Sequence, residues 1–246
     1  MATTETGTLQ NKRVVVIGGT SGMGRATALA ALGAGAEVVI VGRSPERLKQ
    51  VREESGGRIE AVALDIRQEE AVKQFFADLR PFDHLIISAG EMTEGLGPFF
   101  TLDLASARAQ FESRFWGPYM AARYGGPKLR EYGSITFFTG MYGEKVAPDA
   151  AVPSAVHGAV ERLCRVLAVE LAPLRVNVVS PGTIDTPLHA GTPEEQRSAF
   201  FAQVAQVVPG RRVGQAEDVA SAILALIQNS YITGMTLSVD GGARLI

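Results

Sequence analysis

Short apolar runs recur along the chain, and each is followed by a longer stretch in which apolar residues return with helical spacing. Most of these runs are apolar throughout, which is typical of strands in a parallel sheet covered on both faces. The pattern predicts strands at 13–17, 37–41, 59–64, 84–87, 134–138, 175–179 and 236–239. It predicts helices at 24–32, 45–54, 69–79, 104–123, 155–171 and 216–227.

Two helices have explicit start signals. Ser44 precedes Pro45, so the Ser44 side chain is expected to cap the helix that begins there. The stretch Thr192-Pro193-Glu194-Glu195 predicts a capping box at the start of a further helix.

Strands and helices alternate over all 246 residues, and no repeat or linker interrupts them. This alternation favours a doubly wound α/β sheet with right-handed crossovers. We therefore expect one Rossmann-like domain over residues 1–246, with a seven-stranded parallel sheet and helices on both faces. Residues 1–10 are expected to form a polar N-terminal tail.

Composition and charge narrow the possible partners. A net charge of −2 and an isoelectric point near 6.0 give no electrostatic reason to expect nucleic acid or an anionic membrane. No apolar run reaches the roughly 18 residues of a membrane span, and the polar start does not resemble a signal peptide. The cytoplasm is the expected location. Cys164, the one cysteine, falls in a predicted helix and is expected to be a buried, reduced thiol.

A glycine-rich loop, Gly18-Gly19-Thr20-Ser21-Gly22-Met23-Gly24, connects the first strand to the first helix. Gly18 permits the tight turn, Gly22 lets the backbone approach a pyrophosphate, and Gly24 allows close helix–strand packing. The free N–H groups and the dipole of the helix start favour phosphate. Because the loop lies between the first strand and the first helix, it predicts a dinucleotide site. That predicted site also includes Thr20, Ser21 and Met23.

The second strand bears on the choice of cofactor. NAD-binding folds of this layout carry an acidic residue at this strand end for the ribose hydroxyls. Here the strand ends Val41-Gly42-Arg43, so no carboxylate repels a 2′-phosphate, and Arg43 offers a planar cation suited to one. The alternative is that Arg43 is only a solvated surface charge. The sequence favours NADP(H) over NAD(H).

With these residues in place, the chain resembles the short-chain dehydrogenase/reductase family from about Leu9 to Ala243. Leu64-Asp65-Ile66 matches a family aspartate, and Ser88-Ala89-Gly90 resembles the end of the Asn-Asn-Ala-Gly motif. Two further stretches are similar to the strand beside the nicotinamide and to the last strand and tail. They are Arg175-Val176-Asn177-Val178-Val179-Ser180-Pro181-Gly182 and 232–242.

The resemblance implies roles for individual residues. Asp65 is implied to hydrogen-bond the adenine, while the Ile184 backbone and the Thr186 hydroxyl hold the carboxamide. It also implies a homotetramer or dimer, a small-molecule substrate, and a mobile substrate lid at about 186–212. The cofactor-binding residues implied in this way are Asp65, Ile66, Ser88, Ala89, Gly90, His157, Pro181, Gly182, Ile184 and Thr186.

The catalytic positions depart from the family pattern. The family resemblance implies acid–base catalysis by a tyrosine and a lysine, helped by a serine and an asparagine. Here Pro153 stands at the tyrosine position and His157 at the lysine position, while Gly140 replaces the serine and Arg114 the asparagine. Loss of a general acid typically lowers the rate by about 10²–10⁴-fold.

Three other residues are candidates for the chemistry. Tyr142 is the first candidate for a replacement acid, with His157 or Arg114 supplying positive charge nearby; alternatively, Tyr142 is a pocket-wall aromatic. His157 either hydrogen-bonds the nicotinamide ribose or is only a small polar residue facing the cofactor. Arg114 either binds an acidic substrate group or phosphate, or forms a structural ion pair with Glu112 or Glu144.

Three functions are compatible with these residues. The first is an NADP(H)-dependent oxidoreductase with a non-standard acid, acting on a small carbonyl, alcohol or activated alkene. The second is a catalytically inactive NADP(H)-binding protein that acts as a sensor or partner subunit. The third is a non-redox lyase or isomerase, which the intact cofactor half disfavours. No metal site is expected, because no zinc or calcium ligand spacing occurs.

Overall fold

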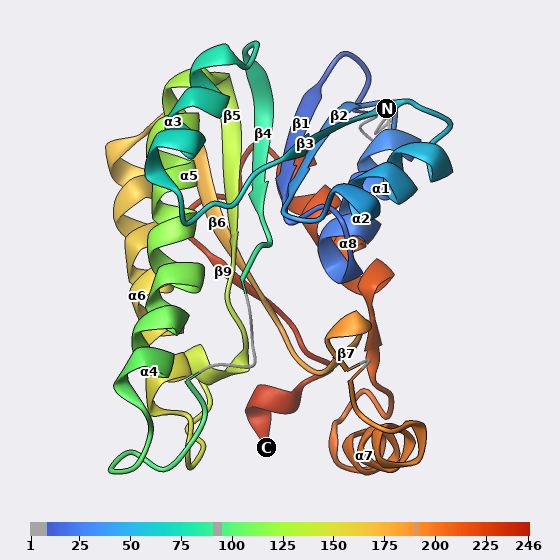
Figure 1. Cartoon of the computed structure of the whole chain (residues 1–246), viewed down its shortest axis with the longest axis vertical. Coiled ribbons are helices and arrows are strands. Elements are labelled where there is room, and N and C mark those ends of the chain that lie inside the picture. Colours follow the sequence, from blue (N-terminus) through green and yellow to red (C-terminus); the bar gives the residue numbers. More distant parts are fainter. Residues whose placement is uncertain (1–8, 91–94, 190) are drawn as a thin grey trace, which may run out of the picture.

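A seven-stranded parallel sheet forms the centre of the computed structural model, which describes residues 9–90, 95–189 and 191–246 (Figure 1). The strand order is β3-β2-β1-β4-β5-β6-β9. The order and the parallel pairing confirm the predicted doubly wound fold, while most of the predicted tail lies outside the described residues. The strands are β1 (Arg13–Ile17), β2 (Glu37–Gly42), β3 (Ile59–Ala63), β4 (Phe82–Ile87), β5 (Leu129–Phe138), β6 (Arg175–Pro181) and β9 (Thr236–Val239).

Helices cover both faces of this sheet (Figure 1). Successive residues of β1 point to opposite faces, so Val14 and Val16 join one apolar core and Val15 and Ile17 the other. The first core is closed by α1 (Gly22–Gly33), α2 (Pro45–Glu54) and α8 (Ala216–Gln228). The second is closed by α3 (Glu69–Asp78), α5 (Gly117–Gly125) and α6 (Ala151–Glu170).

The predicted helix at 104–123 is three elements. It consists of α4 (Leu104–Phe111), a π-helical turn η1 (Glu112–Trp116), and α5. The predicted helix at 155–171 begins earlier, at Ala151, and Pro153 lies in its first turn. Proline is tolerated there because the N–H groups of a first turn have no partner within the helix.

Several short elements connect the main strands and helices. The described residues form four 3₁₀ turns: η2 (Gly126–Lys128), η3 (Met141–Gly143), η4 (Pro187–His189) and η5 (Ala243–Leu245). Beyond the carboxyl edge of the sheet, β7 (Ile184–Asp185) pairs with β8 (Gly214–Gln215), and α7 (Glu194–Val207) lies between them in the sequence (Figure 1). The predicted lid, residues 186–212, contains α7.

One predicted helix start is confirmed and one is wrong. The Ser44 hydroxyl accepts a hydrogen bond from the Arg47 backbone N–H at 3.3 Å, which caps α2 as expected. The predicted capping box at Thr192 does not form, because α7 begins one residue later than the box requires. Pro193 is therefore the N-cap of α7, and its side chain makes no capping bond.

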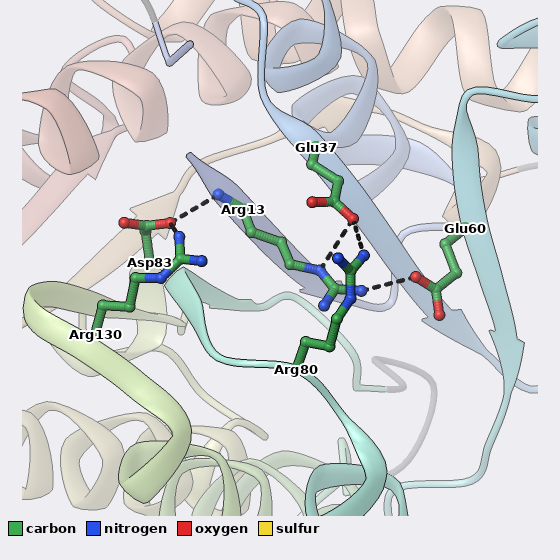
Figure 2. Close-up of polar contacts among 6 residues, drawn as sticks. All are labelled: Arg13, Glu37, Glu60, Arg80, Asp83 and Arg130. Atoms are coloured by element: carbon green, nitrogen blue, oxygen red, sulfur yellow. Dashed lines mark hydrogen bonds and ion pairs between the residues drawn. The ribbon is translucent and has the colours of Figure 1, made fainter. Parts of the chain in front are cut away.

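Charged side chains join the strands at the amino edge of the sheet (Figure 2). The buried Arg13 guanidinium contacts Glu60 at 2.8 Å and Glu37 at 3.5 Å. The Asp83 carboxylate accepts hydrogen bonds from the Arg13 backbone N–H at 2.8 Å and from Arg130 at 2.7 Å. These contacts tie β1 to β2, β3, β4 and β5, so this edge is occupied by structural ion pairs.

Cys164 is buried in α6, and its thiol donates to the Val176 carbonyl oxygen at 3.3 Å. Burial raises the pKa of this thiol to about 12. The thiolate is therefore scarce at neutral pH, which confirms Cys164 as a packing residue. In the part of the chain that the structure describes, none of the helices combines the length and apolar character needed to cross a bilayer.

Candidate active site

A cleft of about 600 Å³ opens at the carboxyl ends of the parallel strands. Ligands of doubly wound sheets bind at this edge, because the strand–helix loops converge there. Every described residue that the sequence assigned to the cofactor or to catalysis lines this one cleft. They are Gly18, Thr20, Ser21, Gly22, Met23, Gly24, Arg43, Asp65, Ile66, Ser88, Ala89, Gly90, Arg114, Tyr142, His157, Pro181, Gly182, Ile184 and Thr186.

The glycine loop leaves the start of α1 open to a ligand. Gly18 has a positive φ of 88°, and a Cβ there would come within 2.7 Å of the Ala89 backbone nitrogen. A side chain at Gly24 would collide with the Gly18 carbonyl oxygen and the Ser88 hydroxyl. The N-cap Ser21 makes no side-chain capping bond, and the first turn has no acidic residue. The unpaired N–H groups of this turn fit a phosphate.

Four charged side chains gather where β2 and β3 end, and we call this the β2–β3 end of the cleft. Both Asp65 oxygens accept hydrogen bonds from the Arg67 side chain, at 3.0 Å and 2.6 Å. The Arg67 bonds lower the pKa of Asp65, which keeps its carboxylate ionised. Arg43 and Arg47 line the cleft beside this pair, so cations outnumber carboxylates at this end.

The segment after β4 is fixed against the glycine loop. The Ser88 hydroxyl donates to the Ile17 carbonyl oxygen at 3.0 Å, and the Ser88 N–H bonds the same oxygen at 2.9 Å. Gly90 has a φ of 152°, and a Cβ there would lie 2.9 Å from Cγ of Arg114. This close approach lets the arginine side chain lie across Gly90.

The far wall is formed by the turn after β6. A Cβ at Gly182 would come within 2.8 Å of the Asp240 backbone, so the turn packs tightly on the C-terminal segment. Thr186 lies next to Gly22 of the glycine loop. Leu188 and Phe200, from the predicted lid, line the cleft and are partly exposed.

The opposite part of the cleft lies where β5 ends, and we call it the β5 end. It is lined by Arg114, Thr139, Gly140, Met141, Tyr142 and His157. The π-helical turn η1 carries Arg114, and its Nη2 donates to the Gly90 carbonyl oxygen at 3.3 Å. Burial lowers the pKa of Arg114 to about 10, so the guanidinium stays charged at neutral pH. Glu144 is one of the two carboxylates that the sequence offered as a partner for Arg114. It forms an ion pair with Arg244 at 3.5 Å.

His157 is 2% exposed, and among the described residues neither ring nitrogen has a hydrogen-bond partner. Burial and the nearby charge of Arg114 lower the pKa of His157 to about 4, so the ring is neutral at pH 7. The ring fills space that a serine at position 140 would need, because a Cβ on Gly140 would lie 3.0 Å from His157 Cε1. Tyr142 stacks on the imidazole at 6.4 Å between centroids and 19° between planes.

Two neighbouring positions do not supply a proton donor to the cleft. Pro153 is buried in the first turn of α6 and is not among the lining residues. Glu161, one turn beyond His157, lies beneath Gly143 and leaves no room there for a side chain. Burial and the charge of Glu144 raise the pKa of Glu161, and Thr139 donates to its carboxylate at 3.4 Å. Glu161 therefore supports the turn that carries Tyr142.

Comparison with known proteins shows the family to which the chain belongs. The sequence model of a family described as enoyl-(acyl carrier protein) reductase matches residues 18–244. Short-chain dehydrogenase/reductase ATR9 of Stachybotrys chlorohalonatus is 32% identical, over 97% of this chain and 99% of its own. The chain belongs to the short-chain dehydrogenase/reductase family. Membership of this family supports an oxidoreductase.

Two further proteins are similar to this chain over most of its length. L-xylulose reductase of Mus musculus is 30% identical, over 95% of this chain and 97% of its own. A solved structure described as a small-chain dehydrogenase in complex with NADPH is 35% identical, with a TM-score of 0.83. It covers 96% of this chain and 99% of its own. The fold is common to the family, whereas the substrates that members are named for differ.

The lining residues that were not predicted from the sequence include the polar side chains of Arg47, Arg67, Ser113 and Thr139. Arg47 follows Arg43 by four residues, in the first turn of α2, and Arg67 follows Asp65 by two. The recurrence of arginine after β2 and β3 was the available signal. Ser113 and Thr139 gave none, since each is an ordinary small polar residue next to a catalytic position.

Proposed function

We propose that this protein is an NADP(H)-dependent oxidoreductase acting on a small carbonyl, alcohol or activated alkene, in which Tyr142 is the general acid in the direction of reduction and its phenolate is the base for an alcohol. One observation carries the proposal. The cleft that gathers the dinucleotide-site residues ends at a phenol stacked on His157, with the Arg114 cation lining the same end. Acid, cation and cofactor site are thus in a single cleft.

The residues present fit a phosphorylated dinucleotide. The uncapped start of α1 suits the pyrophosphate. Arg43 and Arg47 supply positive charge where β2 ends, which suits a 2′-phosphate. The related structure in complex with NADPH supports the same choice. We therefore propose NADP(H) over NAD(H), held by the lining residues of the glycine loop and the β2–β3 end.

The reaction needs a hydride and a proton. NADPH supplies the hydride when it is bound. The Tyr142 hydroxyl is the proton donor to the substrate oxygen, and the charge of Arg114 stabilises the phenolate that remains. His157 is neutral, so it orients the Tyr142 ring by stacking and contributes no charge.

The Tyr142→Phe variant tests the acid. The phenyl ring keeps the stacking on His157 but has no proton to give, so we expect turnover of NADPH with a carbonyl substrate to fall at least about tenfold. NADPH affinity, followed by fluorescence titration, should not change. The control is Tyr132→Phe, because Tyr132 is 68% exposed and outside the cleft. An unchanged rate in Tyr142→Phe would remove Tyr142 from the mechanism.

The Arg43→Ala variant tests the cofactor preference. Because NADPH carries the 2′-phosphate and NADH does not, we expect NADPH binding to weaken about tenfold or more while NADH binding changes little. Arg52→Ala, on the exposed side of α2 and outside the cleft, is the charge-matched control. Equal weakening for both nucleotides would contradict the assignment of Arg43 to the 2′-phosphate.

A nucleotide-binding protein without catalysis is the second candidate. It is favoured by the buried Pro153 and by Gly140, neither of which offers a hydroxyl to the cleft. This function predicts that NADPH binds, that no carbonyl substrate is turned over, and that Tyr142→Phe changes nothing measurable. The titration and the turnover assay together decide between the two.

A further inference from the structure

Tyr142 lies in η3, a short turn whose backbone hydrogen bonds are local. The Gly143 N–H bonds the Gly140 carbonyl oxygen at 3.1 Å, and the Glu144 N–H bonds that of Met141 at 3.1 Å. These bonds set the shape of the turn. Where the turn lies relative to the cleft depends on the segments that contact it.

One of these segments is formed by residues 240–244, which follow β9 and lie beyond the carboxyl edge of the sheet (Figure 1). We call this segment the C-terminal turn. It contacts the two residues that come directly after η3. Arg244 Nε lies 3.5 Å from Glu144 Oε2, and Lys145 Nζ donates to the Ala243 carbonyl oxygen at 3.4 Å. The C-terminal turn is thus joined to the end of the turn that carries Tyr142.

The buried carboxylate of Asp240 fixes the shape of the C-terminal turn. It accepts hydrogen bonds from the N–H groups of Gly242 and Arg244, both at 2.9 Å, and from Arg244 Nη1 at 3.0 Å. Burial opposes the ionisation of Asp240, but the two N–H bonds and the Arg244 charge bring its pKa below the usual value. Asp240 is therefore ionised at neutral pH and orients the Arg244 side chain.

The C-terminal turn is also fixed to two other parts of the chain. It packs on the turn after β6, because a Cβ at Gly182 would lie 2.8 Å from Cα of Asp240. Just beyond α7, the Gly210 N–H bonds the Gly241 carbonyl oxygen at 2.8 Å. These contacts make the C-terminal turn a firm base from which Arg244 reaches η3.

The charge of Arg244 matters because two carboxylates meet at Gly143. Glu161 lies beneath Gly143, and Glu144 follows it in the sequence. Burial and the charge of Glu144 raise the pKa of Glu161, so the two acidic groups oppose each other. Arg244 offsets this repulsion by pairing with Glu144. Without the cation, we expect Glu144 to move away and to take the end of η3 with it.

We propose that Arg244 is a positioning residue for Tyr142, which it holds against His157 by pairing with Glu144 at the end of η3. Arg244 is not among the described residues that line the cleft, so it acts through Glu144 and not on a ligand. The effect on catalysis rests on the proposed oxidoreductase function, whereas the effect on the position of Tyr142 does not.

The test observes Tyr142 directly, by ¹⁹F NMR of protein in which 3-fluorotyrosine replaces all five tyrosines. The Tyr142 resonance is the one lost in Tyr142→Phe, and its chemical shift depends on the stacking with His157. We expect Arg244→Gln and Glu144→Gln each to shift or broaden this resonance and to leave the other four unchanged. Arg244→Lys keeps the charge and should restore part of the original shift.

Kinetics then connect the position of Tyr142 to catalysis. With NADPH and 4-nitrobenzaldehyde as the test carbonyl, we expect kcat of Arg244→Gln to fall about tenfold while the KM for NADPH stays the same. The midpoint of urea unfolding should change little, because an exposed ion pair contributes little to stability. Arg80→Gln is the charge-matched control, since Arg80 is exposed and pairs with Glu37 at the amino edge.

The outcomes separate this proposal from the proposed function. An unchanged Tyr142 resonance in Arg244→Gln or in Glu144→Gln overturns the positioning role, whatever the activity of the parent protein. A shifted resonance with unchanged kcat in an active parent also overturns it, because the position of Tyr142 would then not matter for proton transfer. A shifted resonance in both variants of a parent that reduces no carbonyl compound supports the positioning role and contradicts the oxidoreductase function.

Discussion

At the scale of single residues, the altered catalytic positions fit one another. The His157 ring occupies the space that the absent side chain of Gly140 leaves open. Its charge is suppressed by burial and by the nearby Arg114, so the positive charge at this end comes from η1 and not from α6. If the usual family residue is introduced at only one of these positions, the neighbouring side chains are not arranged to accommodate it.

Gly140→Ser tests this coupling. The backbone at Gly140 is extended, so serine is compatible with its φ and ψ, but its Cβ would crowd the His157 ring. We expect the free energy of unfolding to fall by about 1–3 kcal/mol, measured by urea denaturation. In a His157→Ala background the same change should cost much less. Gly158→Ser is the control, because a Cβ there meets nothing within 4 Å. An equal cost in both backgrounds would contradict the coupling.

At the scale of elements, apolar patterning predicted all seven strands of the main sheet but not the interruptions of the helices. The π turn η1 joins α4 directly to α5, so the stretch 104–123 reads in the sequence as one continuous helix. The predicted start of α6 was four residues too late, because the helix begins at Ala151 and its first turn accepts Pro153. Such details depend on backbone hydrogen bonds, which residue spacing does not report.

Gly24→Ala tests the fit between α1 and the loop that precedes it. The added methyl group would collide with the Gly18 carbonyl oxygen and the Ser88 hydroxyl, so the start of α1 must move away. We expect NADPH to bind about tenfold or more weakly, with a lower midpoint of urea unfolding. Gly33→Ala lies in the same helix with open space around its Cβ. That change should raise the free energy of unfolding by about 0.5–1 kcal/mol, and equal effects of the two variants would contradict this account.

At the scale of the whole molecule, the sequence predicted which residues line the cleft better than it predicted how the charged side chains pair. The carboxyl ends of parallel strands meet at one edge, so residues that follow β1 to β6 had to converge there. The Asp65–Arg67 pair and the amino-edge ion pairs need the strand register and side-chain directions, which a single sequence does not give. The sheet thus separates a structural edge, rich in ion pairs, from the edge that carries the candidate site (Figures 1 and 2).

The buried carboxylate of Asp83 is the group at the structural edge whose contribution to the free energy of unfolding can be tested by pH. Burial alone would raise the pKa of Asp83, but hydrogen bonds from the Arg13 N–H and Lys12, with the charge of Arg130, bring it below its usual value. Its stabilisation is therefore complete above the unfolded pKa of about 3.9 and is lost as the pH falls through the lower folded pKa. We expect Asp83→Asn to lower the free energy of unfolding at pH 7 by about 2 kcal/mol.

The measurement is urea denaturation of the parent chain and Asp83→Asn over a series of pH values. The gap between the two should be constant from pH 7 to about pH 5 and should shrink below about pH 4, where the carboxyl groups of the unfolded chain are protonated. Asp78→Asn is the matched control, because Asp78 is exposed at the end of α3. A gap that persists unchanged in acid, or an equal effect of Asp78→Asn, would mean that the charge of Asp83 contributes nothing to holding β1, β4 and β5 together.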